Sequence, residues 1–170
     1  MDGTGDRLKL ADSLDWQLGS TNSSPWTIEV WVRWNVLDAN NRGIIGQNAS
    51  AGWFFTGSST IGELSFGSGN FTTIATSGAG MTTGVWYHVA VDHDSSGKIR
   101  LYVDGVMRGS ATPANSALSN YAADLAIGAQ GHAGQVDMNG HLDELRITKG
   151  VARCGSDSGF TAPTAAYPRS

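Results

Sequence analysis

The segment Trp26–Trp34, WTIEVWVRW, alternates apolar and polar side chains along its length. Successive side chains of a strand point to opposite faces, so one face of this segment is wholly apolar: Trp26, Ile28, Val30, Val32 and Trp34. The opposite face takes the four residues in between: Thr27, Glu29, Trp31 and Arg33. A strand with one apolar face is half-buried in a layered β-structure.

The same period of two continues in Trp86–Val91 and Ile99–Val103. Between them, Asp92–Gly97 is polar and ends in glycine, which predicts the loop of an antiparallel hairpin. One short helical turn is expected at 114–118, after Pro113. Weaker strand patterns occupy further segments: residues 5–10, 43–47, 52–56, 61–66, 71–75, 106–109, 123–128 and 141–148. Together these patterns predict about eleven short strands.

The composition excludes other fold classes. Glycine is frequent, at 23 of 170 residues, whereas Glu and Lys, which normally cover exposed helix faces, are rare. Parallel strands would need long helical crossovers, so the sheets are expected to be antiparallel. A single open sheet of about eleven twisted strands would curl. Two sheets packed face to face are therefore expected. The sequence predicts an all-β antiparallel sandwich in one domain, residues 1–170, with 156–170 as an extended tail.

Six segments, in this order along the chain, together resemble the concanavalin A-like, laminin-G-like superfamily: Asp2–Asp6, Trp26–Val32, Trp86–Val91, Leu101–Gly105, Leu125–Gly128 and Gly140–Ile147. The ending Thr148–Arg153, followed by Phe160–Pro163, is similar to the variant found in phage tail and bacterial surface proteins. Many of those have Tyr where this chain has Cys154. The resemblance implies a jelly-roll sandwich and a binding role, commonly toward glycans.

Net charge, apolar run length and cysteine content limit the classes of partner and the location that the sequence allows. The formal net charge of -4 argues against nucleic-acid binding. No apolar run approaches the roughly 18 residues of a membrane span, and no signal peptide is visible. Cys154 is the only cysteine, so no intramolecular disulfide is possible. We expect an extracellular or virion location and a larger multidomain or oligomeric parent assembly.

No catalytic motif is convincing. Glycoside hydrolysis needs two carboxylates about 5–10 Å apart, which glucanases of this superfamily place at E-x-D-x-x-E or E-x-D-x-E. No glutamate of this chain has an aspartate two residues downstream. Asp92–Gly97 matches the start of a calcium-binding EF-hand loop, but its twelfth position is Val103 rather than Glu, so a hairpin turn is expected. The sequence therefore indicates that the chain is not an enzyme.

The best sequence candidates for ligand contact are a polar cluster and two aromatic residues: Asp38, Asn40, Asn41, Trp53 and Tyr121. Carboxylates and amides hydrogen-bond sugar hydroxyls, and an aromatic ring forms an apolar wall. The alternative is that Asp and Asn form a turn and that Trp53 lies in the core.

Asp143 is a candidate metal ligand. Strict alternation puts its carboxylate on the face of Leu145 and Ile147, where an unpaired charge is costly. The carboxylate then either accepts backbone N–H or Arg hydrogen bonds, or binds one structural Ca²⁺ together with Asp2 and loop oxygens. Folds of this resemblance often hold a calcium ion where the first and last strands meet.

Taken together, the residues and the resemblance favour a non-catalytic recognition module of a phage tail or bacterial surface or secreted protein, whose partner is a glycan or cell-surface polysaccharide. Two alternatives stay open. The module could bind protein as a structural or interaction domain, or it could be a glycan-degrading enzyme with an atypical site.

Overall fold

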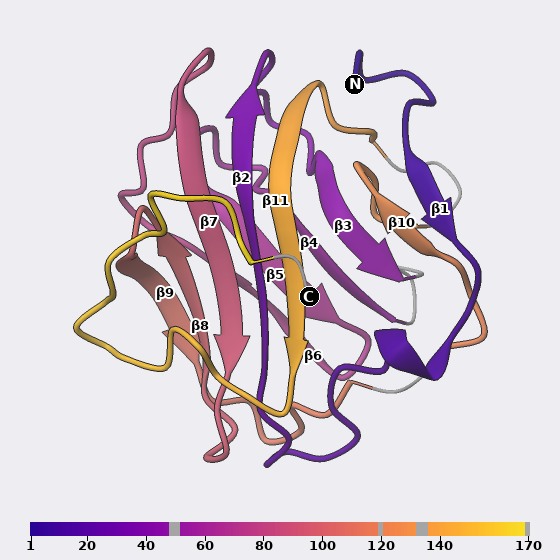
Figure 1. The fold of residues 1–170 in the computed structure, drawn as a ribbon, viewed down its shortest axis with the longest axis vertical. Helices are drawn as coiled ribbons and strands as arrows, with labels where there is room; N and C mark the ends of the chain where they lie inside the picture. The colour runs from indigo at the N-terminus through magenta and orange to yellow at the C-terminus, as the bar shows by residue number, and fades with distance from the viewer. Residues whose placement is uncertain (48–51, 119–120, 132–135, 169–170) are drawn as a thin grey trace.

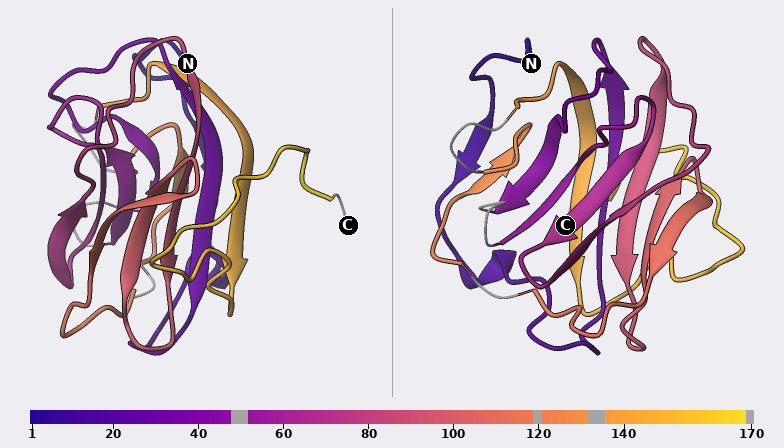
Figure 2. Two further views of the ribbon diagram at one scale, coloured as in Figure 1. Left: turned by 90° about the vertical axis from the view of Figure 1, so that its left-hand side faces the viewer. Right: turned by 180° about the vertical axis from the view of Figure 1, so that it is seen from behind.

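The computed structural model describes residues 1–47, 52–118, 121–131 and 136–168, which form two antiparallel sheets packed face to face (Figures 1 and 2). One sheet has the strand order β1-β10-β3-β4-β5-β6 and the other β11-β2-β7-β8-β9. The six-stranded sheet contains β1 (Leu8–Leu10), β3 (Gly43–Gln47), β4 (Trp53–Gly57), β5 (Leu64–Ser68), β6 (Phe71–Ala75) and β10 (Leu125–Ile127). The five-stranded sheet contains β2 (Trp26–Trp34), β7 (Trp86–His93), β8 (Ile99–Val103), β9 (Val106–Ala111) and β11 (Gly140–Lys149). The all-β sandwich prediction is confirmed.

β2 lies in the five-stranded sheet between β11 and β7, and its apolar face forms the centre of the core. The side chains from Trp26 to Trp34 on that face are all 0% exposed. The Trp26 ring meets Phe66 of the opposite sheet at a centroid distance of 5.2 Å. The alternation of apolar residues therefore identified which face of β2 joins the two sheets.

One local expectation differs from the structure. Residues 114–118 form no helix, because the two groups that would close the turn bond elsewhere: the Leu118 N–H donates to the Gly19 carbonyl, and the Ala114 carbonyl accepts from the Asn22 side chain. Instead, the described residues contain one 3-10 turn, η1 (Leu14–Trp16), where Ser13 accepts the N–H of Asp15. No helix in these described ranges has the length and apolar character of a membrane-spanning helix.

β11 contains a bulge that the alternation pattern could not reveal. Asp143 pairs with Trp31, but Arg146 pairs with Glu29, so β11 carries one extra residue between these pairs. Glu144 occupies the bulge with φ of 51°, in the left-handed region. The expectation that Asp143 shares a face with Leu145 and Ile147 is wrong, because the extra residue places those two against the core while Asp143 is exposed.

Residues 150–168, which contain no strand, cross the outer face of the five-stranded sheet (Figure 1). Figure 2 shows this C-terminal segment outside the layer formed by β2 and β11. The Phe160 ring packs edge-on against Tyr102 and His88, at centroid distances of 5.2 and 5.7 Å. Cys154 is also buried there, with Ala90 and Tyr102. The C-terminal segment therefore covers polar residues of the outer face that would otherwise meet water.

Candidate functional site

The polar cluster that the sequence singled out closes its own turn. Asp38 accepts two hydrogen bonds from the Arg42 guanidinium, at 2.6 and 3.1 Å, and two more from the backbone and side-chain N–H groups of Asn40. The hydrogen bond with Arg42 holds the pKa of Asp38 below its ordinary value. The Asn41 carbonyl accepts a hydrogen bond from Gln130. These hydrogen bonds form the turn that the alternative describes, and ligand contact by Asp38, Asn40 and Asn41 stays a prediction.

The two aromatic candidates do not join this cluster. Trp53 is 1% exposed and lies in the core, so its ring offers no face to a ligand. Tyr121 is half-buried, and its carbonyl accepts a hydrogen bond from Gln47 at the end of β3. Asp38 precedes Gly43, which begins β3, so the candidates lie at opposite ends of that strand. The structure does not bring the sequence-predicted ligand residues together.

A groove on the outer face of the five-stranded sheet brings together carboxylate and aromatic side chains, which the sequence candidates do not do. Its volume is about 430 Å³, and it is lined by Trp31, Trp86, Asp143, Glu144 and residues 163–166 of the C-terminal segment. Cross-strand pairing gathers them: Trp31 of β2 pairs with Asp143 of β11, and the adjacent Arg33 pairs with Trp86 of β7. Trp86 is 41% exposed, and Trp31 is half-buried.

The groove is held in place from beneath and from the side. Trp31 packs edge-on against buried His88 at 5.5 Å, and Trp86 lies 6.3 Å from the His141 ring. The Tyr167 N–H donates to Glu144 Oε2 at 2.6 Å, which ties the C-terminal segment to the bulge of β11. Two aromatic side chains are therefore presented on a supported surface beside a fixed wall.

One sequence signal for this groove existed. Trp31 falls on the polar face of β2, with Thr27, Glu29 and Arg33, where a large aromatic residue is unexpected. Trp86 begins the next predicted strand along the same sheet. What the sequence could not show is that Trp86 and Asp143, far apart in the chain, lie beside Trp31.

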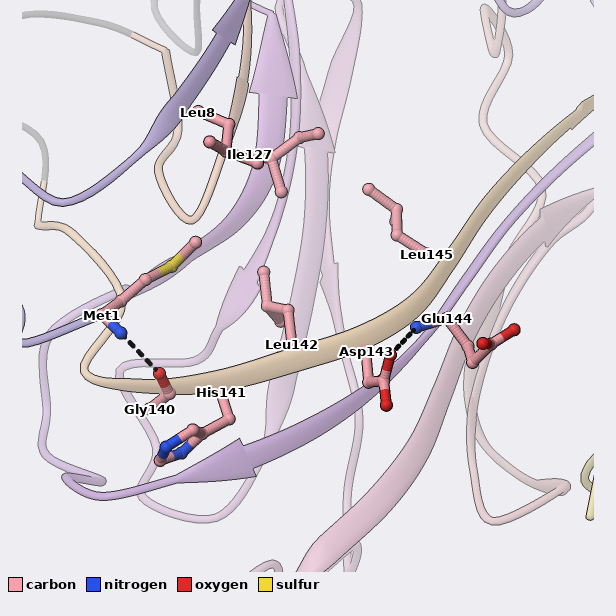
Figure 3. Close-up of a pocket in the computed structure, with 9 residues that line it drawn as sticks. All are labelled: Met1, Leu8, Ile127, Gly140, His141, Leu142, Asp143, Glu144 and Leu145. Carbon is pink, nitrogen blue, oxygen red and sulfur yellow. Dashed lines mark hydrogen bonds between the residues drawn. The ribbon is translucent and has the colours of Figure 1, made fainter. Parts of the chain in front are cut away.

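A second hollow of about 400 Å³ lies between β11 and the edge strand β1 (Figure 3). Asp143 and Glu144 line both hollows, and the rest of the second lining is mainly aliphatic: Met1, Leu8, Ile127, Leu142 and Leu145. Among the described residues that line the second hollow, the His141 imidazole is the one aromatic ring. It therefore offers a poorer surface for a polar ring than the tryptophan groove does.

A buried charge cluster anchors the C-terminal segment. Glu29 is 2% exposed and accepts hydrogen bonds from Arg146, at 2.8 Å, and from the Tyr167 hydroxyl, at 3.1 Å. The Arg146 guanidinium also stacks over the Tyr167 ring, 3.6 Å from its centroid. Burial raises the pKa of Glu29, but the hydrogen bonds with His88 and Arg146 outweigh burial, so the pKa lies below its ordinary value.

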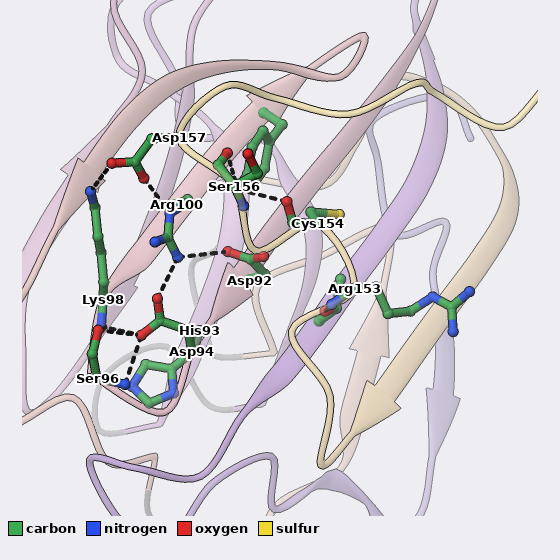
Figure 4. A network of polar contacts seen from close by, with 12 residues as sticks. Asp92, His93, Asp94, Ser96, Lys98, Arg100, Arg153, Cys154, Ser156 and Asp157 are labelled. Carbon is green, nitrogen blue, oxygen red and sulfur yellow. Dashed lines mark hydrogen bonds and ion pairs between the residues drawn. The ribbon is translucent and has the colours of Figure 1, made fainter.

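The EF-hand-like segment is the turn of the β7–β8 hairpin (Figure 4). Asp94 Oδ1 accepts the N–H groups of Ser96 and Lys98, and Asp94 Oδ2 pairs with Arg100 at 2.7 Å. Asp94 therefore closes the turn through Oδ1 and joins it to β8 through Oδ2, as expected of a hairpin turn.

The calcium ligands expected from the sequence are separately engaged. Asp2 accepts the N–H of Thr4, and Asp143 accepts the N–H of Glu144. The carboxylate that meets the N-terminal loop is Asp137, which sequence reasoning missed; it accepts the Gly5 N–H and pairs with Arg7. Within the described residues, no three His, Cys, Asp or Glu side chains are grouped to hold a metal.

Calcium binding at Asp2 and Asp143 therefore stays a prediction of the sequence with its own test. An ion that binds only the folded state adds about 2.7 kcal/mol when its free concentration is 100 times Kd. On that prediction, a chelator lowers Tm by several degrees, and Asp143→Asn removes most of the chelator effect. An unchanged Tm after chelation, measured by calorimetry, contradicts it.

The family follows from comparison of the whole chain with known families. The family model described as the concanavalin A-like lectin/glucanases superfamily, of the laminin-G type, matches residues 2–152. The chain belongs to this superfamily. The resemblance drawn from the six sequence segments is thereby confirmed. A search of curated proteins returned no match.

Solved structures share the concanavalin A-like fold at low identity. An inferred carbohydrate-binding protein of Bacteroides ovatus is 18% identical, with a TM-score of 0.69 over 86% of this chain and 42% of that one. Domains LG4-5 of mouse laminin α1 are 16% identical, with a TM-score of 0.61 over 88% and 41%. Domain 4 of AbnA, an extracellular arabinanase of Geobacillus stearothermophilus solved with arabinotriose, is 22% identical, with a TM-score of 0.59 over 85% and 66%. The chain spans less than half of the first two.

Proposed function

We propose that this concanavalin A-like chain is a non-catalytic recognition module and that the outer-face groove binds a glycan. The observation that carries the proposal is the placement of Trp31 and Trp86 beside the Asp143 and Glu144 carboxylates in one groove. The tryptophan rings offer an apolar surface to the C–H face of a sugar ring. The carboxylates accept hydrogen bonds from sugar hydroxyls.

The known structures support a glycan partner without identifying the sugar. The Bacteroides protein is described as carbohydrate-binding, and the arabinanase domain was solved with arabinotriose. This chain aligns with only 42% of the Bacteroides protein. That partial coverage supports the proposal that this chain is one module of a larger protein. We place that parent outside the cell, on a bacterial surface or in a phage tail, as the C-terminal motif of the sequence suggests.

A protein partner is the second candidate, because the chain also exposes aliphatic residues along one edge. Leu8, Leu10 and Leu14 are 63, 41 and 69% exposed, and Leu8 lines the aliphatic hollow beside β11. Exposed apolar patches often mark protein interfaces. The same binding experiments must therefore separate sugar ligands from protein ligands.

Trp86→Ala is expected to weaken glycan binding about 10-fold or more. Truncation of an exposed tryptophan at a binding centre typically costs about 2 kcal/mol, and 1.4 kcal/mol corresponds to a factor of ten in Kd. A glycan array identifies a neutral oligosaccharide ligand, with arabinotriose as the first soluble probe, and isothermal titration calorimetry measures its Kd. Val85→Ala is the matched control, because Val85 is 46% exposed and does not line the groove.

Other outcomes separate the alternatives. Equal affinities of the wild type and Trp86→Ala would place the sugar elsewhere. Absence of sugar binding, with capture of a defined protein ligand, would favour the interaction module. Release of reducing sugar from the bound glycan would favour the enzyme with an atypical site.

A further inference from the structure

The groove carries charge of one sign. Asp143 and Glu144 are the charged residues of its lining, and no Lys, Arg or His of the described chain lines it. Asp143 is exposed; its Oδ1 accepts the Glu144 N–H, and its Oδ2 has no hydrogen-bond partner among the described residues (Figure 3). A ligand in the groove therefore meets a free carboxylate oxygen.

The neighbouring arginines lie outside the lining of the groove. Arg146 pairs with buried Glu29 at 2.6 Å and stacks on Tyr167. Arg33, on the adjacent row of β2, donates its Nε–H to the Gly84 carbonyl at 3.0 Å and is not part of the groove lining. Neither arginine lines the groove between Trp31 and Asp143.

The free carboxylate oxygen of Asp143 and the lack of a cation in the described lining determine which sugars suit the groove. A carboxylate accepts hydrogen bonds and donates none, so Asp143 fits a hydroxyl but repels a carboxylate, sulfate or phosphate group on the ligand. The net charge of -4 opposes the approach of an anionic chain as well. Resting on the proposed glycan function, we propose that the groove selects uncharged glycans over acidic ones and that Asp143 is the residue that sets this selectivity.

The test compares sugars that differ in charge alone. Oligogalacturonides and their carboxyl-reduced counterparts, which are neutral galactose oligomers of the same length and linkage, are titrated into the wild type at pH 7.5. We expect the neutral member to bind at least about 10-fold more tightly, which corresponds to 1.4 kcal/mol. Raising the salt concentration should narrow this ratio, because screening weakens the repulsion.

The Asp143→Asn variant tests whether Asp143 is responsible for the selectivity against acidic sugars. Asparagine keeps an oxygen that can accept the Glu144 N–H and removes the charge. We expect the ratio of neutral-sugar affinity to acidic-sugar affinity to fall several-fold, because the repulsion of the acidic sugar is removed. Asp124→Asn is the control: Asp124 precedes β10 in the other sheet and is exposed, so its replacement changes the net charge equally but should leave the ratio unchanged.

The outcomes distinguish the selectivity from the binding function. Tighter binding of the uronate by the wild type, or a ratio that Asp143→Asn leaves unchanged, overturns the selectivity and leaves the glycan function standing. Failure of every neutral and acidic sugar to bind overturns both, and Trp86→Ala then has no sugar affinity to lower.

Discussion

Glu29→Gln is expected to lower the free energy of unfolding by about 3–5 kcal/mol, the usual cost of removing one partner of a buried ion pair. Glu29 is 2% exposed, and its Oε1 lies 2.6 Å from Arg146 Nη2. Glutamine has nearly the same shape but leaves Arg146 without its counter-charge. For a domain of this size, such a loss lowers Tm by roughly 6–20 °C.

The same change should loosen the C-terminal segment, because the Tyr167 hydroxyl donates to Glu29. Limited proteolysis within residues 150–168 is expected to become faster than in the wild type, and thermal unfolding by calorimetry gives the change in stability. Arg153→Gln is the matched control, since Arg153 is 43% exposed and 3.4 Å from Glu29, where a pair contributes about 0–1 kcal/mol. Equal losses in both variants would contradict a dominant role for the Glu29–Arg146 pair.

Asp92 is expected to make the protein less stable at pH 8 than at pH 5. Its carboxylate is 0% exposed beneath the C-terminal segment, where the Cys154 backbone N–H and the Arg100 guanidinium only partly offset the effect of burial on its pKa. The nearest cation is Arg100, with Nη1 3.9 Å from Oδ1 (Figure 4). Burial raises the pKa of Asp92 from 3.8 to about 7, although Arg100 opposes the shift.

The direction of this pH dependence follows from the number of protons that the folded and unfolded states bind. Between pH 4 and pH 7 the folded state holds a proton on Asp92 that the unfolded state has lost, so stability falls as the pH rises through this window and levels off above it. Two pH units within the window correspond to about 2.7 kcal/mol, the loss expected between pH 5 and pH 8. Asp94, Asp157, Tyr102 and Cys154 surround the site, and Asp94 and Asp157 act in the same direction as burial.

Asp92→Asn isolates this contribution from that of Glu29, whose lowered pKa removes stability in acid. Asparagine cannot ionise, so the stability of the variant relative to the wild type should rise by about 2–3 kcal/mol from pH 5 to pH 8. Urea unfolding at both pH values measures the difference. Parallel stability curves for the two proteins would show that Asp92 is not the responsible group.

Much of the fold was predictable from local patterns. A strand repeats every two residues, so Trp26–Trp34 and Ile99–Val103 identify themselves and their core faces without any partner. The Asp94 turn was likewise local, because its acceptors and donors lie within four residues. The six ordered segments were sufficient for the family, whose model spans residues 2–152.

The candidate site was not predictable in the same way. Trp31 stood out on a polar face, but Trp86 and Asp143 reach it through pairing between strands far apart in the chain. The face on which Asp143 lies depended on one extra residue in β11, and a single-residue shift moves a side chain to the other face of a sheet.

The sequence by itself determined the strands, the core face of β2, the hairpin turn and the superfamily, because each depends on spacing along the chain or on the order of segments. The tertiary structure decided which residues meet: Trp31 with Trp86 and Asp143, Glu29 with Arg146 and Tyr167, and Asp92 with the segment that buries it. Strand register and the path of a segment without strands depend on long-range packing, and no periodicity in the sequence records them.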